Sequence, residues 1–379
     1  MATSSNDPDS PVSKDSVIFH PVKLRQQTAR NRIWVPPMCQ YVSSEGLPTQ
    51  WHYQHYGMLS IATGCVIVEA TAVSRAGMVT PEDLLLDHPQ QVAHFRKLAN
   101  VIAENGALPG IQLCHGGRKS ARSSPWNGNG PLLPESGGWK IYSPSALPFG
   151  EGYQLPEELS EDDIKKTIQD FAASAEMAAA AGFKLIEIHA GHGRLVHSFL
   201  SRISNTRADS YGAAETENRY LVELSDAVRK AIGSERVLAF RLSCVDYVER
   251  GLVIEDAVKH AITLKRHGVD LIDCTSGGII TPIKKRTFPG YQVPYSSLIK
   301  ELVGIDTGAV GEIGTLKFAE KIIESDQASV VLLGRKALSD PLYLMRNAAA
   351  VGRWELVPRP YQRAFKRAKQ VQNELIPEL

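Results

Sequence analysis

The sequence predicts an α/β protein built as a single (β/α)8 TIM barrel, with a long loop excursion after strand 3 and a C-terminal extension. Two observations predict it: eight short apolar runs recur along the 379 residues, and helical stretches lie between them. An open doubly wound sheet is the alternative, but it usually carries a G-x-G-x-x-G turn after its first strand. The sequence contains no such turn, so we favour the barrel.

The eight expected strands are mostly rich in β-branched residues and bounded by Gly, Pro or Asn. Such runs are typical of strands that are buried on both faces. In chain order they are IWVPPM (33–38), CVIVEA (65–70), LPGIQLC (108–114), KLIEIHA (184–190), VLAFRLS (237–243), DLIDCTSG (270–277), TGAVGEI (307–313) and SVVLLGR (329–335).

The clearest expected helix covers residues 160–182. Ser160 is suited to cap its start, acidic residues fill the first turn where the helix dipole favours them, and Gly182 supplies the stop. Similar patterns cover residues 89–105, 214–232, 254–267, 314–325 and 339–350. Residues 115–158 are dense in Gly, Pro, Ser and Trp, and we expect them to form the excursion over the barrel mouth.

Around this barrel, taken as residues 16–350, we expect a disordered tail over residues 1–15 and the extension over 351–379. Forty-two basic and 41 acidic residues leave a formal charge of +1, which gives no indication of a nucleic-acid partner. Five cysteines without a C-x-x-C pair indicate neither a disulfide framework nor a zinc ribbon. No apolar run reaches the roughly 18–20 residues of a membrane span, and no secretory signal opens the chain, so we expect a cytoplasmic protein.

Side chains at the carboxyl ends of the strands are the candidates for chemistry in such a barrel. Hydrogen-bond donors are common there and carboxylates are rare, while Glu69 and Glu187 lie inside strands and could face either way. A metal-dependent hydrolase would need several imidazoles and acids, so we expect no metal site. Glycine and arginine after the last two strands fit a phosphate site, although an ordinary turn with a surface arginine is an equal alternative. The candidates are Met38, Cys39, Tyr41, Ala70, Gln112, His189, His192, Arg241, Ser276, Gly277, Gly278, Gly311, Gly334 and Arg335.

An ordered series of motifs runs from about residue 17 to 365. It comprises P-M-C-x-Y after the first strand, H-x-x-H-Y (52–56), I-V-E-A-T-A-V (67–73), I-Q-L-x-H-x-G-R-K (111–119), I-E-I-H-x-x-H-G (186–193), S-N-x-R-x-D-x-Y-G with E-N-R (204–219), F-P-G-Y-Q-V (288–293) and G-R (334–335). Together these motifs resemble the old yellow enzyme family, specifically its thermophilic-like branch. One extra residue in YGAAETENR and the two chain ends depart from the pattern.

The resemblance implies a non-covalently bound FMN across the barrel mouth. By motif position, Gln112 would bond the pyrimidine edge and Arg241 would lie near N1 and C2=O, where a fixed cation favours the reduced flavin. Pro37, Met38 and Ala70 would line the ring, and Cys39 would lie near N5. Gly311, Gly334 and Arg335 would hold the phosphate. The alternatives are a buried ion pair for Arg241 and a small core residue for Cys39.

The resemblance also assigns His189 and His192 to the carbonyl oxygen of an activated alkene such as an enone, enal, maleimide or nitroalkene. Negative charge builds on that oxygen as hydride reaches the β-carbon, and two donors would stabilise it. NADPH would act as a transient hydride donor in the same space, which predicts ping-pong kinetics. We expect His197 to lie in the following helix with a structural role.

Arg194 stands where the family usually has the tyrosine that protonates the α-carbon. A guanidinium stays protonated and is a poor proton donor. Water, Tyr41 or Tyr291 could supply the proton; Arg194 could bind an anionic group of the substrate; or slow protonation could make the protein a flavin-dependent alkene isomerase. We favour reduction with a proton from solvent.

In this branch an arginine near the C-terminus reaches into the active site of a neighbouring subunit. P-Y-Q-R-A-F places Arg363 at the matching position, although a solvated basic tail is the simpler alternative. Tyr41, Lys119 and Tyr291 are further candidates for lining the substrate pocket. We therefore expect a homodimer or a homotetramer.

Overall fold

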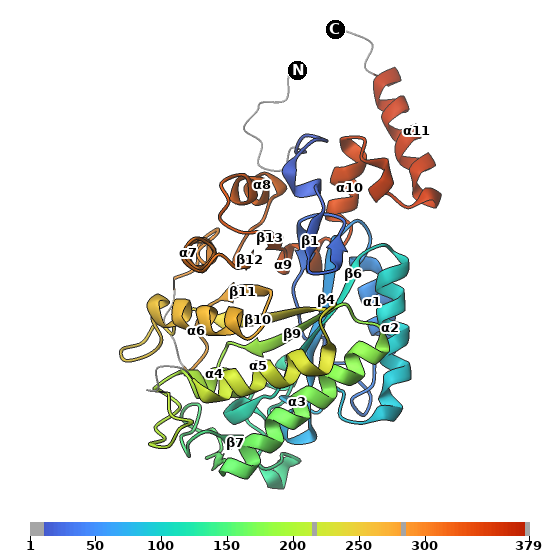
Figure 1. Cartoon of the computed structure of the whole chain (residues 1–379). Helices are drawn as coiled ribbons and strands as arrows, with labels where there is room; N and C mark the ends of the chain where they lie inside the picture. The colour runs from blue at the N-terminus through green and yellow to red at the C-terminus, as the bar shows by residue number, and fades with distance from the viewer. Residues whose placement is uncertain (1–10, 214–217, 282–285, 376–379) are drawn as a thin grey trace.

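The structure is a computed structural model that describes residues 11–213, 218–281 and 286–375, the side chains of 369–375 excepted (Figure 1). Its centre is a closed barrel in which every neighbouring pair of strands is parallel and β3 pairs with both β4 and β13. The barrel strands are β3 (Ile33–Val35), β4 (Cys65–Ala72), β6 (Leu108–Cys114), β9 (Leu185–Ala190), β10 (Val237–Ser243), β11 (Leu271–Thr275), β12 (Asp306–Ala309) and β13 (Val330–Leu332). Each overlaps one predicted run, and the predicted barrel is confirmed.

Side chains alternate between the barrel interior and the surrounding helices. Leu185, Val237 and Leu271 pack inside, one from each of three adjacent strands, whereas Ile186 and Leu238 pack in the cluster that joins the strands to the helices. Positions two and four residues further along a strand therefore face inward as well. This parity turns the carboxyl-end residues of β6, β9, β10 and β11 toward a common centre.

Helices surround the barrel, as Figure 1 shows. Those that follow predicted patterns are α2 (Val92–Glu104), α3 (Glu161–Ala181), α5 (Arg219–Ile232), α6 (Ile254–Arg266), α8 (Leu316–Glu324) and α10 (Tyr343–Ala350), whereas the short helix α9 (Arg335–Ser339) was not predicted. In α3 the Ser160 hydroxyl accepts from the backbone N–H of Asp163, and Gly182 ends the helix at φ +106°, so both expected caps are confirmed. The structure adds α1 (Gln50–Leu59), α4 (Leu195–Leu200) and α7 (Val293–Val303), which the periodicity did not predict. Residues 214–217, where a helix and the extra residue were expected, lie outside the described residues.

A hairpin of β1 (Val22–Leu24) and β2 (Gln27–Ala29) covers the amino ends of the strands, and its apolar residues pack onto the interior layer. Arg25 of this hairpin forms an ion pair with Asp270, directly before β11. Of the expected tail, residues 1–10 lie outside the described residues, whereas Val12 is buried. The packed part of the chain therefore begins by residue 11 rather than at residue 16.

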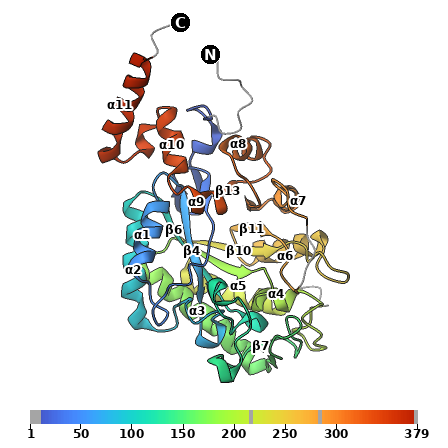
Figure 2. The same ribbon diagram turned by 180° about the vertical axis from the view of Figure 1, so that it is seen from behind.

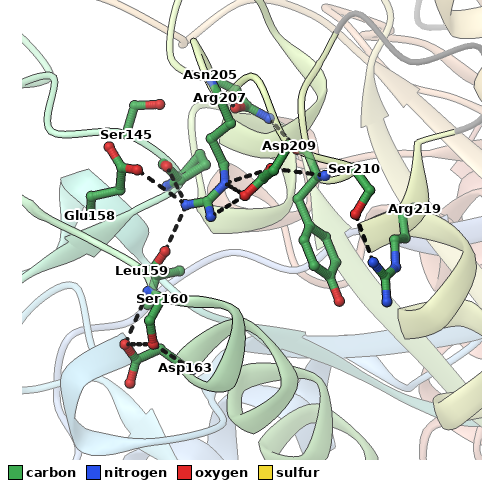
Figure 3. Close-up of polar contacts among 12 residues, drawn as sticks. Ser145, Glu158, Leu159, Ser160, Asp163, Asn205, Arg207, Asp209, Ser210 and Arg219 are labelled. Atoms are coloured by element: carbon green, nitrogen blue, oxygen red, sulfur yellow. Dashed lines mark hydrogen bonds and ion pairs between the residues drawn. The ribbon is translucent and has the colours of Figure 1, made fainter.

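The excursion after β6 consists of turns and two short paired strands, β7 (Tyr142–Ser143) and β8 (Glu157–Glu158). Figure 3 shows how Arg207 anchors it: one guanidinium nitrogen donates to the carbonyl of Leu159 at 2.6 Å and to Glu158 at 3.4 Å. The same guanidinium pairs with Asp209, and the Ser145 hydroxyl accepts from the backbone N–H of Thr206 at 3.0 Å. The S-N-x-R-x-D motif thus fixes the covering loop.

The C-terminal extension packs at Leu356 and Val357 and then continues as α11 (Arg359–Leu375). Both views show α11 at the periphery, extending away from the barrel (Figures 1 and 2). Within the described part of the chain, none of the helices combines the length and the apolar character that crossing a membrane requires.

The short edge strand β5 (Leu84–Leu85) pairs with β4 outside the barrel.

Candidate active site

A cavity of about 630 Å³ opens where the carboxyl ends of the strands meet. Its walls come from β3, β10, β11, β12 and β13, from the loops that follow them and from the loop after β9, so residues far apart in sequence are brought together. Of the predicted site residues, those in the wall are Pro37, Met38, His192, Arg241, Tyr291, Gly311, Gly334 and Arg335.

His189 and His192 lie side by side at the end of β9. Their rings are edge to face, with centroids 5.2 Å apart, and His192 Nδ1 lies 3.5 Å from His189 Nε2. Burial, the neighbouring imidazole and nearby cations hold the pKa of His189 well below its usual range, and burial and cations do the same for His192. Both imidazoles are therefore neutral near pH 7, and each carries one N–H donor.

Hydrogen bonds determine which nitrogen carries that proton. His189 Nδ1 accepts from the backbone N–H of Gly191 at 3.3 Å, which leaves the proton on Nε2, the nitrogen that faces His192. The hydroxyl of Thr275 donates to Gln292 Oε1 at 3.3 Å and lies 2.8 Å from His192 Nε2. Because that hydroxyl proton is directed at Gln292, Thr275 accepts from His192, and the proton of His192 is also on Nε2. We infer that both imidazoles carry their proton on Nε2, and that in this structure the N–H of His189 points at His192 Nδ1 and the N–H of His192 points at Thr275.

The loop that carries His192 is held closely. His192 has φ +54°, its backbone N–H donates to the hydroxyl of Ser243 at 2.9 Å, and its carbonyl accepts from Lys119 at 2.8 Å. A Cβ atom on Gly278 would lie 2.8 Å from the Cα of His192, so only glycine fits there. Next to it, Gly193 donates to His197 Nδ1 at 2.8 Å, and His197 Nε2 lies 3.0 Å from the buried Asp246. His197 is in α4, where a structural role was expected.

A layer of polar side chains lies one inward-facing position below the histidines. Gln112 donates to Glu187 at 2.7 Å, and Arg241 lies 3.4 Å from Asp273. Burial, and then the charge of Asp273, raises the pKa of Glu187 to about 8, and burial raises that of Asp273. Glu187 is therefore mostly protonated at pH 7. Arg241 Nε has no hydrogen-bond partner, although it is buried.

The opposite end of the cavity is lined by bare backbone. Gly311 has φ +122°, and a Cβ there would lie 2.9 Å from Gln292 and 3.1 Å from the ring of Tyr291. A Cβ on Gly334 would meet Met38 at 3.4 Å. The side chain of Arg335 is 76% exposed and lies 3.3 Å from Glu312. Tyr291 is thus placed at this glycine-lined end rather than beside the histidine pair.

The segment after β3 lies against a buried acid. Glu69 accepts from the backbone N–H of Gln40 at 2.6 Å and from the hydroxyl of Tyr56 at 3.0 Å, and it lies 3.3 Å from His52. The strand register shifts between Val68 and Thr71, which interrupts the alternation, and Glu69 faces α1 rather than the interior. Glu69 therefore anchors the backbone next to Cys39.

Two predicted side chains on this segment are neutral. Burial raises the pKa of the Cys39 thiol well above its usual range. The pKa of Tyr41 is raised by burial and by the neighbouring thiol, and its backbone has φ +54°. Ala70 is buried in β4, and its expected role beside the flavin ring stays a prediction.

A family model described as NADH:flavin oxidoreductase / NADH oxidase matches residues 17–351. The chain belongs to this family. It is 39% identical over 356 residues to an NADPH dehydrogenase of Geobacillus sp. (strain WCH70), covering 93% of this chain and 99% of that protein. An NADPH dehydrogenase of Bacillus subtilis (strain 168) is 37% identical over 352 residues, which cover 92% of this chain and 99% of that protein.

Solved structures show the same fold. Morphinone reductase superposes with a TM-score of 0.75 at 23% identity, covering 89% of this chain and 90% of that one. The old yellow enzyme homologue from Zymomonas mobilis has a TM-score of 0.74 at 24% identity, covering 87% and 91%. The predicted resemblance to the old yellow enzyme family is confirmed, and the chain is an oxidoreductase of this type with FMN as its cofactor.

The residues present fit FMN. The cavity volume lies within the roughly 300–1,000 Å³ of small-molecule sites. Gly311 and Gly334 leave backbone free at the end where Arg335 stands, and the guanidinium-bearing side chain of Arg241 forms part of the cavity wall. These residues would hold the phosphate and the electron-rich side of the ring.

Two residues that the sequence analysis did not single out complete the site. Thr275 contacts His192, and Asp273 faces Arg241. The inward parity of β11 would have revealed Asp273 and Thr275, because both follow Leu271 at even spacing. Arg363 lies exposed on α11 and is not in the wall of the cavity, so its expected contact with a neighbouring subunit stays a prediction.

Proposed function

We propose that the chain is an NADPH-consuming ene-reductase that reduces an activated alkene by a ping-pong mechanism. The observation that carries the proposal is the pair of neutral imidazoles, both with Nε2–H, at the end of β9 beside a cavity that fits FMN. The names of the relatives, NADPH dehydrogenase, support NADPH as the donor. When bound, FMN supplies the hydride that it has accepted from NADPH.

His189 and His192 bind and orient the carbonyl oxygen of the alkene. As the β-carbon accepts hydride, negative charge collects on that oxygen, and the two N–H groups stabilise it in a site from which water is largely excluded. One such donor typically contributes about 3 kcal/mol to the transition state. Thr275 accepts the Nε2–H of His192 and so keeps the proton on that nitrogen, and a bound carbonyl oxygen would share this N–H with Thr275 in a three-centre hydrogen bond.

Arg194 leaves the α-carbon without the usual tyrosine, and solvent delivers the proton. Tyr41 is a second candidate donor, since its raised pKa keeps the phenol protonated. If protonation were slow, hydride would return and the protein would isomerise alkenes instead.

Comparison of NADPH consumed with alkene reduced tests the proposal. Purified holoenzyme is incubated anaerobically with NADPH and a panel of enones, enals, maleimides and nitroalkenes. One NADPH consumed per alkene reduced, with parallel lines in double-reciprocal plots, is the expected result. Isomerised alkene without stoichiometric NADPH loss would establish the isomerase, and intersecting lines would contradict a shared site.

We also propose that the protein is a homodimer or homotetramer and that Arg363 lines the substrate pocket of a neighbouring subunit. The exposed, peripheral position of α11 supports this proposal, because within one chain the helix extends away from the barrel (Figure 2).

A further inference from the structure

The guanidinium of Arg194 has no partner in the described structure. Arg194 lies two residues after His192, at the residue before α4 begins. Its Nε and Nη1 atoms are shielded from solvent and form no hydrogen bond with any described residue. Buried donors without a partner are rare, and each is costly, more so when the group is charged. The side chain is therefore arranged to bind something that the chain itself does not provide.

A second arginine, Arg122, resembles Arg194 in having a buried donor without a hydrogen-bond partner. Arg122, on the excursion, donates from Nη2 to the carbonyl of Asn129 at 2.7 Å and stands over the ring of Tyr153, 5.3 Å from its centroid. Its Nε atom is also buried without a hydrogen-bond partner. Burial lowers the pKa of Arg122, and the charge of Arg194 lowers it further.

Among the residues that the structure describes, no carboxylate lies within 4.0 Å of Lys119, Arg122 or Arg194. Burial raises the pKa of Asp83 to about 6 and the charge of Arg194 opposes this shift, but the Asp83 oxygens accept from the backbone N–H of Val79 at 2.8 Å and from the Thr80 hydroxyl at 2.8 Å. Burial and the charges of both arginines hold the pKa of Lys119 well below its usual range. No described carboxylate therefore neutralises the charge of Arg122 or Arg194.

Taking the proposed function as its basis, we infer that Arg194 and Arg122 form an anion subsite, and that the substrates are activated alkenes that carry a carboxylate. A planar guanidinium matches the two oxygens of a carboxylate, and the resulting charge-assisted bonds are among the stronger ones in proteins. The carbonyl oxygen binds His189 and His192, and the carboxylate of the same molecule binds Arg194. Replacement of the usual tyrosine at this position thereby changes the choice of substrate.

Two pairs of esters distinguish anion binding at this subsite from reduction of the alkene. Monomethyl and dimethyl succinate, which cannot be reduced, are titrated into the oxidised holoenzyme, and binding is followed by calorimetry and by the change in flavin absorbance. Monomethyl and dimethyl fumarate are then mixed with the anaerobically reduced holoenzyme, and flavin reoxidation is followed by stopped flow. The members of each pair differ in one negative charge.

In Arg194→Gln we expect the Kd of monomethyl succinate to rise about tenfold or more, the loss for one charge-assisted hydrogen bond, while that of dimethyl succinate changes less than about threefold. Arg122→Gln should likewise raise the Kd of monomethyl succinate more than that of dimethyl succinate, which keeps the test available if the first variant folds poorly. Arg202→Gln is the matched control, because Arg202 is exposed on the same segment, and it should leave both values unchanged.

If Arg194→Gln weakened the binding of the monoester and the diester equally, the inference would be overturned, because Arg194 would then only maintain the shape of the site. Slower flavin reduction by NADPH in Arg194→Gln, with unchanged succinate binding, would also overturn it and assign the arginine to a phosphate of the donor. If wild-type holoenzyme fails to reduce either fumarate, the proposed function fails, while the succinate pair still reports on the anion subsite.

Discussion

Thr275→Val removes one hydroxyl from behind His192 and conserves the side-chain volume. The Thr275 oxygen lies 2.8 Å from His192 Nε2, and Thr275 is 3% exposed, so water cannot easily replace it. Loss of a buried hydrogen bond of this kind corresponds to about 1–2 kcal/mol, or a fall of about 5- to 30-fold if the whole effect reaches the transition state. The imidazole also loses the contact that keeps its proton on Nε2.

Stopped-flow measurement of the two half-reactions tests this effect. We expect reoxidation of the reduced flavin by an enone to slow by that factor and reduction by NADPH to change little, because charge develops on a carbonyl oxygen only in the first of these. Thr307→Val is the matched control: the Thr307 hydroxyl is buried without a hydrogen-bond partner, so its removal should leave both rates intact. If Thr275→Val retained the full rate with enones, the hydroxyl would not position His192.

Three further predictions use other features of the site. Gly278→Ala should slow alkene reduction at least about tenfold, because its Cβ would displace His192, whereas Gly152→Ala, which has a similar positive φ but open space, should cost only stability. Glu187→Gln should become more stable relative to wild type as the pH rises. The folded protein keeps the Glu187 proton up to a pKa of about 8, whereas the unfolded chain releases it near 4.5. The wild type is therefore destabilised progressively between these two pH values, and the variant is not. Urea unfolding at pH 5 and pH 9 measures the difference, and an equal gap at both would contradict the protonated state. Truncation after residue 355 should weaken both assembly and substrate binding, as sedimentation and turnover would show; a fully active, unchanged assembly would refute the role of Arg363.

The barrel was predictable because its strands are buried on both faces and therefore appear as apolar runs. The missed helices lack such a pattern. In α1, histidine and tyrosine occupy the buried positions that leucine or isoleucine usually fill, and His52 and Tyr56 are buried because they bind Glu69. The helix α7 starts next to Pro294, so its start did not stand out.

The site was predictable to the extent that motifs mark strand ends. Thr275 was missed because the reading of the sixth strand placed its end one residue later, at Ser276, and a shift of one residue changes the face. Glu187 could not be assigned to a face without the parity of β9. The unpaired state of Arg194 depends on which carboxylates approach it in space, and only the packed loops of the excursion decide that.

The most direct test of the central claim measures one turnover of reduced holoenzyme with an enone in His189→Ala and His192→Ala. If the two imidazoles stabilise the oxygen that becomes negative, each variant should still bind FMN and should lose about a hundredfold in the rate of flavin reoxidation. Rates within about threefold of wild type in both variants, with FMN bound, would contradict the account.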